Sequence, residues 1–212
     1  MGVVCVINFP LPEGKSGQQT VDMLQKRIET LGATKTGNFV VDCETYQSQQ
    51  PAPQRVMHVL HNSEHPATAF AILDTGTCLV ADNTFDQLIH KLKAFYAPKK
   101  NAKVETKGQR YEIGDFIVKI GSVVLGQNIS FKGILIEVEY CPCVMPGECW
   151  GLMQEFMQGF LGNIIDSPPQ YIKDRLNNAV MPSDTVMQYL EFYNNFRKAA
   201  GQQQQQQQQQ QR

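Results

Sequence analysis

The strongest constraint on the fold is the stretch from Gly37 to Val80, where apolar residues recur with a period of two. Phe39, Val41 and Cys43 alternate with their neighbours in the pattern of a half-buried strand, whose side chains point to opposite faces in turn. Short β-rich runs follow at 56–61, 69–73 and 77–80, with turn-forming residues between them. Short strands joined by tight turns predict an antiparallel meander.

Further strands are predicted outside this stretch, at 3–10, 104–112, 116–124 and 129–140. In the last run the apolar residues change from odd to even positions at Gly133, so a β-bulge is predicted there. Together these runs indicate an α+β fold, an antiparallel β-barrel of about eight strands with flanking helices. Closure into a barrel would remove the exposed sheet edges.

Four helices are predicted from capping signals and from apolar residues at helical spacing. Ser16 with Gln19 forms one capping box and Thr84 with Gln87 a second, while Gly32 marks the end of the first helix. The residues expected to face the core are Val21, Leu24, Ile28 and Leu31 in the first helix, Phe85, Leu88, Ile89, Leu92, Phe95 and Tyr96 at 84–96, Leu152, Phe156, Met157 and Phe160 at 147–161, and Val186, Leu190, Tyr193 and Phe196 in a last helix from Ser183 or Asp184.

The domain organisation follows from the absence in the sequence of any long linker rich in proline, serine or glycine. Residues 1–200 are therefore expected to form a single barrel domain with packed helices. Gln202–Gln211 is a run of ten glutamines, which cannot pack a core. Residues 201–212 are expected to be a low-complexity tail.

Composition and charge exclude several classes of protein. Six cysteines among 212 residues are too few for a disulfide scaffold, and the apolar run at 3–10 is too short to span a membrane. Nineteen basic residues nearly balance twenty acidic ones, so global charge gives no reason to expect a nucleic-acid or membrane partner. We expect a reduced compartment, cytoplasmic or nuclear.

Two groups of potential metal ligands do not have the spacing of a metal site. Cys141 and Cys143 are separated by one residue and Cys149 follows later, whereas zinc sites pair ligands two to four residues apart and need four of them. His58 and His61 would point to opposite faces of a strand. We therefore expect buried thiols and cross-strand or surface histidines, with no metal, no cofactor and no catalytic residue.

Glu137 and Glu139 lie two residues apart, on one face of the predicted last strand. Triphosphate-tunnel phosphohydrolases hold a divalent cation with such alternating carboxylates inside a barrel, followed two residues later by a lysine. Here that position is Cys141, so solvent-facing carboxylates are expected. A metal-dependent phosphohydrolase of that type is the alternative function, and a free-standing ligand-binding barrel is a second one.

Residues 91–110 form a basic segment with a local net charge of +6. Such a segment is typical of a contact with an acidic protein or a nucleic acid, or of a solvated helix end followed by a loop. Phe95 and Tyr96 are expected on the buried face of the helix, where they could not stack on bases. Direct nucleic-acid binding is therefore not expected.

The last helix has an apolar surface wider than the stripe of roughly 100° that one core needs. Such a surface indicates either a contact with another protein or packing of the helices on the barrel. The apolar residues are Val186, Met187, Tyr189, Leu190, Phe192, Tyr193 and Phe196, with Trp150, Met153 and Met157 on the preceding helix.

Several segments spread from end to end resemble the family of subunit 20 of the Mediator complex of RNA polymerase II transcription. The resemblance covers about 200 residues and excludes the glutamine tract. The segments are Met1–Val6, Glu13–Ser16, Gln18–Val21, Val41–Tyr46, His61–Glu64, Asp82–Asp86, Glu137–Tyr140 and Gln188–Tyr189.

This resemblance implies a non-enzymatic nuclear protein, a β-barrel with flanking helices in the head module of the complex. It implies pairing with subunit 18, a similar barrel, and contact with a helical segment of subunit 8. It implies a role as a coactivator that relays activator signals to RNA polymerase II indirectly. The family carries no motif of catalytic residues.

Overall fold

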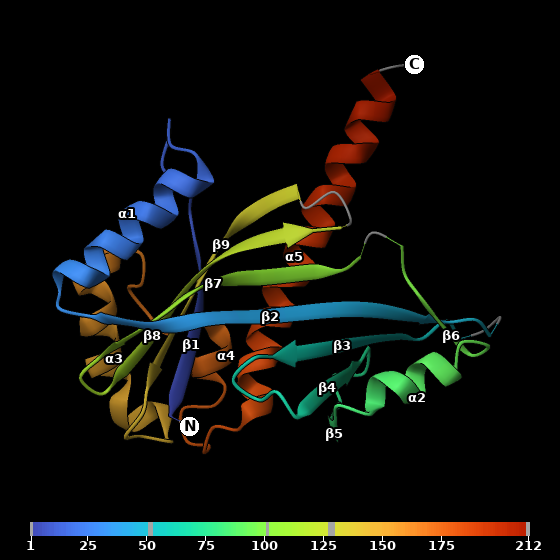
Figure 1. Cartoon of the computed structure of the whole chain (residues 1–212), viewed down its shortest axis with the longest axis horizontal. Helices are drawn as coiled ribbons and strands as arrows, with labels where there is room; N and C mark the ends of the chain where they lie inside the picture. The colour runs from blue at the N-terminus through green and yellow to red at the C-terminus, as the bar shows by residue number, and fades with distance from the viewer. Residues whose placement is uncertain (1, 51–52, 101, 127–129, 211–212) are drawn as a thin grey trace. The chain divides into compact units, whose positions relative to one another are not determined.

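The computed structural model (Figure 1) describes residues 2–50, 53–100, 102–126 and 130–210, with side chains described as far as Gln202. Its strands are β1 (Val3–Phe9), β2 (Thr34–Ser48), β3 (Val56–Asn62), β4 (Thr68–Leu73), β5 (Cys78–Asp82), β6 (Tyr96–Pro98), β7 (Val104–Ile113), β8 (Phe116–Leu125) and β9 (Ser130–Tyr140). Its helices are α1 (Gly17–Thr30), α2 (Phe85–Lys91), α3 (Pro146–Leu161), α4 (Gln170–Lys173) and α5 (Pro182–Gln210).

The strands form one sheet in the order β1-β9-β8-β7-β2-β3-β4-β5, with the short β6 added beside β2. The predicted α+β class, with an antiparallel sheet and flanking helices, is confirmed. Within the described residues the path of strands is open, with β1 at one end and β5 at the other, so it approximates a barrel without closing. Ile129, which begins the last predicted strand, lies outside the described residues.

The chain divides into two compact units. The first unit consists of the residues up to Val40, Thr106–Val123 and Gly133–Gln188. The second consists of Val41–Glu105, Val124–Lys132 and the residues from Tyr189 onward.

The first unit has a core built from strands β1, β8 and β9 and from helices α1 and α3. Along the chain α1 follows β1 and α3 follows β9 (Figure 1). The predicted capping box starts α1, because the Ser16 hydroxyl accepts the Gln19 amide while the Gln19 side chain accepts the Ser16 amide. Val21, Leu24 and Ile28 are buried as predicted, each stabilising by roughly 1.5–3 kcal/mol. Trp150 and Met153 of α3 fill the same core, together with Cys5, Ile7, Tyr111, Ile120, Ile134, Ile136, Val138, Met157 and Phe160.

Strand β1 is an edge strand of the sheet, and a side-chain amide covers its outer backbone. The Val6 N–H donates to Gln188 Oε1 at 2.9 Å, and Gln188 Nε2 donates to the Val4 carbonyl at 3.1 Å. Gln188 belongs to α5 and is itself buried. Its amide thus pairs with the edge as a neighbouring strand would, which blocks addition of another strand there.

In the second unit, the predicted meander is confirmed. Strand β2 pairs with β3, β3 with β4 and β4 with β5, all antiparallel, with Val59 opposite both Glu44 and Ala71. Met57, Val59, Ala71 and Ile89 form a small apolar core. The hydroxyl of Tyr193, on α5, donates to the Val41 carbonyl at 2.8 Å and joins the helix to β2.

The prediction of a helix at 84–96 was wrong in its second half. Helix α2 ends at Lys91, because the chain after Leu92 turns and then pairs with β2 as β6. Phe95 is therefore 52% exposed instead of buried. The Thr84 hydroxyl bonds to Asp82 and makes no capping bond to the helix.

Other predicted core positions also lie at the surface. Leu31 follows the end of α1, Leu88 lies on α2 and Leu152 lies on α3, and all three are about half exposed. Helix α5 continues through the glutamine tract to Gln210, further than the predicted domain end. Within the described residues, no helix is both long and apolar enough to cross a membrane.

Candidate functional site

Two of the three clustered cysteines, Cys143 and Cys149, lie beside the same backbone carbonyl, and Cys141 is exposed. Cys143 Sγ donates to the Met145 carbonyl at 3.2 Å, and Cys149 Sγ lies 3.7 Å from the same oxygen. Burial raises the pKa of the Cys149 thiol to about 12, so it stays protonated at neutral pH. Across the described ranges, no group of three or more His, Cys, Asp or Glu side chains is placed to hold a metal ion.

The histidines of β3 have separate partners, as predicted from strand alternation. His58 Nδ1 lies 3.0 Å from the Thr45 hydroxyl. His61 Nδ1 lies 3.0 Å from Asp42 Oδ1, and its Nε2 lies 3.1 Å from Asp86 Oδ2, without hydrogen-bond alignment. Because carboxylates flank both nitrogens of His61, neither nitrogen is placed to act as a base on a further group.

A cluster of charged side chains in the second unit was not predicted from the sequence. The hydrogen bond that His61 donates to the Asp42 carboxylate raises the pKa of His61, which favours the imidazolium form between Asp42 and Asp86. Lys103 Nζ lies 3.2 Å from Glu44 Oε1 on the adjacent part of β2. This cluster ties α2 and the residues before β7 to β2, so its role is structural.

Glu137 does not face solvent, so that expectation was wrong. Its carboxylate lies 2.7 Å from Lys119 Nζ of β8, and both side chains are 2% exposed. Glu139 is half-buried and accepts the backbone N–H of Gly2 at 2.6 Å. The lysine missing at Cys141 is thus supplied by another strand, but it forms a closed ion pair that a triphosphate cannot reach.

Lys119 could have been found from the sequence. It is the one charged residue in the apolar run of β8, and Glu137 interrupts an equally apolar run in β9. Opposite charges within the apolar stretches of two buried strands indicate a buried pair, because an unpaired buried charge is very costly. Recognising the pair also requires knowing which strands are neighbours.

The wide apolar surface predicted on the last two helices is mostly occupied inside the units. Met153 and Met157 are fully buried in the core of the first unit, and Trp150 nearly so. On α5, Tyr189 and Tyr193 are fully buried and their rings pack 5.8 Å apart. Packing on the fold, rather than contact with a partner, explains these side chains.

Exposed apolar side chains lie instead on β5, at the other end of the sheet. Leu79 is 48% exposed and Val80 is 62% exposed. They pair with Ala71 and Phe70 of β4 and point to opposite faces of the sheet. The strand has no proline or lysine, the residues that often protect an edge. An apolar edge strand of this kind is suited to pairing with a strand of another protein.

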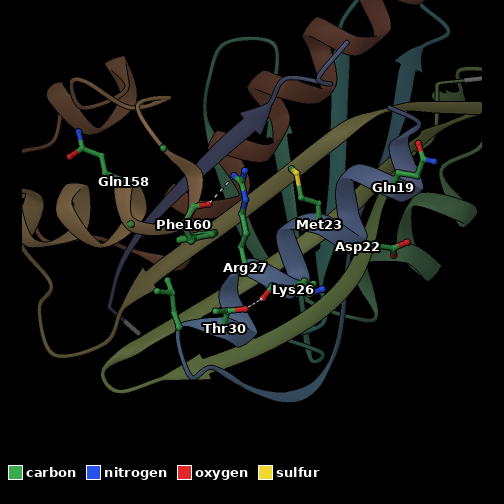
Figure 2. Close-up of a pocket in the computed structure, with 11 residues that line it drawn as sticks. Gln19, Asp22, Met23, Lys26, Arg27, Thr30, Gln158 and Phe160 are labelled. Carbon is green, nitrogen blue, oxygen red and sulfur yellow. Dashed lines mark hydrogen bonds between the residues drawn. The ribbon is translucent and has the colours of Figure 1, made fainter. Parts of the chain in front are cut away.

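The first unit has a groove of about 840 Å³ beside α1 and the end of α3. Figure 2 shows Arg27 projecting from α1 toward Phe160, with Met23 on the same helix. The guanidinium of Arg27 donates to the Phe160 carbonyl at 3.3 Å. Asp22 and Lys26 both line the groove, so its charges are mixed in sign and select neither anions nor cations.

Comparison with known proteins identifies the family. Residues 1–194 match the family model described as the TATA-binding related factor (TRF) of subunit 20 of the Mediator complex. The Mediator of RNA polymerase II transcription subunit 20 of Anopheles gambiae is 50% identical over 212 residues, which cover 93% of this chain and 95% of that one. The Xenopus laevis and Homo sapiens proteins of the same name are 48% and 46% identical over 204 residues, again covering 93% of this chain, with 96% and 95% of their own lengths. This chain therefore belongs to the family of subunit 20 of the Mediator complex.

Proposed function

We propose that this protein is a non-enzymatic subunit of the Mediator head module, which acts in the nucleus as half of a heterodimer with subunit 18. In this proposal it also contacts a helical segment of subunit 8 and helps to relay activator signals to RNA polymerase II. Membership of the family supports a role in transcription regulation. The difference between the two sheet edges is the structural observation that supports pairing with subunit 18.

The two edges differ in what covers them. Gln188 occupies the backbone of β1, whereas β5 presents Leu79 and Val80 at the opposite end of the described sheet. Burial of two such side chains contributes roughly 3–6 kcal/mol, and backbone pairing along β5 adds directional hydrogen bonds. A lasting pair needs about 1,000 Å² of interface, so β5 would form only part of it.

Co-expression with subunit 18 followed by size-exclusion chromatography at micromolar concentration tests the pairing. The two chains are expected to elute together, and Leu79→Asp with Val80→Asp is expected to separate them. Val144→Asp with Leu152→Asp is the matched control, because these apolar residues are about equally exposed in the first unit. Separate elution of the unmodified proteins would refute the pairing. Loss of co-elution in the control variant alone would show that the interface does not include β5.

Nuclear location and membership of the head module have a separate test. Affinity purification of the full chain from nuclear extract, followed by mass spectrometry, is expected to recover subunits 18 and 8. Their absence from a purification that recovers other Mediator subunits would contradict the proposed position in the head module.

The non-enzymatic part of the proposal rests on the closed Lys119–Glu137 pair. No hydrolysis of tripolyphosphate or nucleoside triphosphate is expected with magnesium or manganese. Turnover that disappears in both Glu137→Gln and Glu139→Gln would establish the triphosphate-tunnel alternative instead.

A further inference from the structure

A second cavity, of about 520 Å³, lies entirely within the second unit. Its walls come from β2 and β3, from the residues between β6 and β7, and from the part of α5 before the glutamine tract. Apolar atoms of Val56, Ala102 and Leu125 form part of the lining. The cavity is therefore large enough for a few side chains and has both polar and apolar surfaces.

The charged side chains that line this cavity are all cationic. They are Lys99, Lys100, Arg197 and Lys198, and no aspartate or glutamate is among the described residues that line the cavity with them. Among the described residues, no carboxylate lies within ion-pair distance of any of the four. Four like charges around one cavity, with no carboxylate among its described lining residues, attract an anion.

The guanidinium of Arg197 is held in place by uncharged groups. It donates to the Ala102 carbonyl at 3.0 Å, to Asn194 Oδ1 at 3.0 Å and to the sulfur of Cys43 at 3.1 Å. These bonds fix the position of the cation without neutralising its charge. A charge fixed before the ligand arrives costs little ordering entropy on binding.

The pKa of His58 responds to the positive charges around the cavity. Its ring lines the wall and its Nδ1 lies 3.0 Å from the Thr45 hydroxyl. Burial, together with the smaller effects of the Arg197 and Lys99 charges, lowers the pKa of His58 to about 4, against an opposing effect of Asp74. The imidazole is thus neutral at pH 7 and its ring adds to the uncharged lining.

We propose that this cavity is a binding site for an acidic peptide segment of a protein partner. The carboxylates of the segment would pair with Lys99, Lys100 and Lys198, while an aliphatic side chain beside them would pack on Val56 and Leu125. This site is distinct from the strand pairing proposed for β5. A negative result for that pairing would therefore leave the peptide-binding proposal unaffected.

Peptide chemistry fits the cavity better than nucleic-acid chemistry. A nucleic acid presents a long row of phosphates, which proteins bind with an extended basic stripe, and single strands also need exposed aromatic rings for stacking. This cavity is concave and partly apolar, and no Phe, Tyr or Trp is among the lining residues that the structure describes. A short segment that combines aspartate or glutamate with leucine matches both its charge and its apolar wall.

The test is binding of a fluorescein-labelled peptide with alternating Asp, Glu and Leu residues to the full chain, followed by fluorescence anisotropy. Lys99→Glu with Lys198→Glu should weaken binding at least tenfold. Lys35→Glu with Lys173→Glu is the matched control, because it changes net charge equally at exposed sites of the first unit and should change affinity less than threefold. An equal loss of peptide affinity in the two double variants, or no binding of the peptide by the unmodified chain, would overturn the proposal.

Two further measurements locate the ligand and identify its class. Binding of the peptide should raise the pKa of His58 in an NMR titration, because bound carboxylates offset the field of Lys99 and Arg197. An unchanged His58 titration at saturating peptide would place the ligand elsewhere. A labelled DNA duplex should bind at least tenfold more weakly than the peptide at about 0.15 M salt, where surface charges are largely screened. Tighter DNA binding that is lost in Lys99→Glu with Lys198→Glu would show a nucleic-acid site instead.

Discussion

At the scale of single residues, Lys119 and Glu137 form a buried ion pair in the first unit, in which each side chain compensates the charge of the other. Replacement of Lys119 by Met should cost about 3–5 kcal/mol of unfolding free energy, because Glu137 would remain buried without its cation. Replacement of both, Lys119→Met with Glu137→Leu, should cost less than the sum of the single changes. Urea unfolding of the three variants measures these differences. A loss below about 1 kcal/mol in Lys119→Met would show that the pair is not buried in solution.

His58 should make stability depend on pH in the second unit. Its pKa is lowered from 6.5 to about 4 in the folded chain, so between these values the unfolded chain binds a proton that the folded chain does not. The contribution of His58 is therefore complete above pH 6.5 and declines as pH falls toward 4. His58→Gln should flatten the pH dependence in this range, measured as unfolding free energy against pH. His61 titrates in both proteins, so their difference isolates His58, and identical slopes would contradict the prediction.

At the scale of elements, Gln188 should determine how well α5 holds strand β1. Gln188→Leu removes both side-chain bonds to the β1 backbone and leaves Val6 N–H and Val4 C=O buried without them, which should cost about 2–4 kcal/mol. Asn195→Leu is the control on the same helix, because Asn195 is exposed and its replacement should change stability by less than about 0.5 kcal/mol. Hydrogen exchange at Val6 should accelerate in Gln188→Leu alone. Unchanged exchange would show that the amide does not protect this edge.

Elements governed by local rules were predicted well from the sequence. The Ser16 capping box begins α1, and the period-two stretch forms the meander from β2 to β5. The end of α2 was missed because pairing of Tyr96–Pro98 with β2 competes with the helix, and that competition is not visible in a local window. For the apolar residues of α5, contact with a partner and packing on the barrel both stayed open, because the sequence alone does not fix their tertiary packing.

The cationic cavity of the second unit was predicted only in part, because its lining also depends on tertiary packing. The basic segment at 91–110 was visible as charge, but its grouping with Arg197 and Lys198 of α5 depends on the fold. Interpretation of Phe95 as a buried residue also failed once α2 ended early. The sequence pattern thus indicated Lys99 and Lys100, whereas the structure places them with Arg197 and Lys198 around one cavity.

At the scale of the whole molecule, we propose that residues 1–200 fold as one cooperative domain. Strands β2, β7, β8 and β9 and helix α5 each contribute residues to both compact units. Melting of either unit alone would interrupt all of these elements. A single unfolding transition, with far-UV and near-UV signals changing together, is expected. Two separate transitions would show that the units unfold independently.

The glutamine tract should contribute nothing to the stability of this domain, although its backbone extends α5 to Gln210. Glutamine side chains bury little apolar surface, so truncation after Gly201 should change the thermal midpoint by no more than about one or two degrees. Truncation after Phe192 is the contrasting variant, because it also removes Tyr193 and Arg197, which bond to Val41 and Cys43. Loss of these contacts should lower the midpoint by roughly ten degrees or more. A comparable decrease after removal of the tract alone would show that the tail packs against the domain.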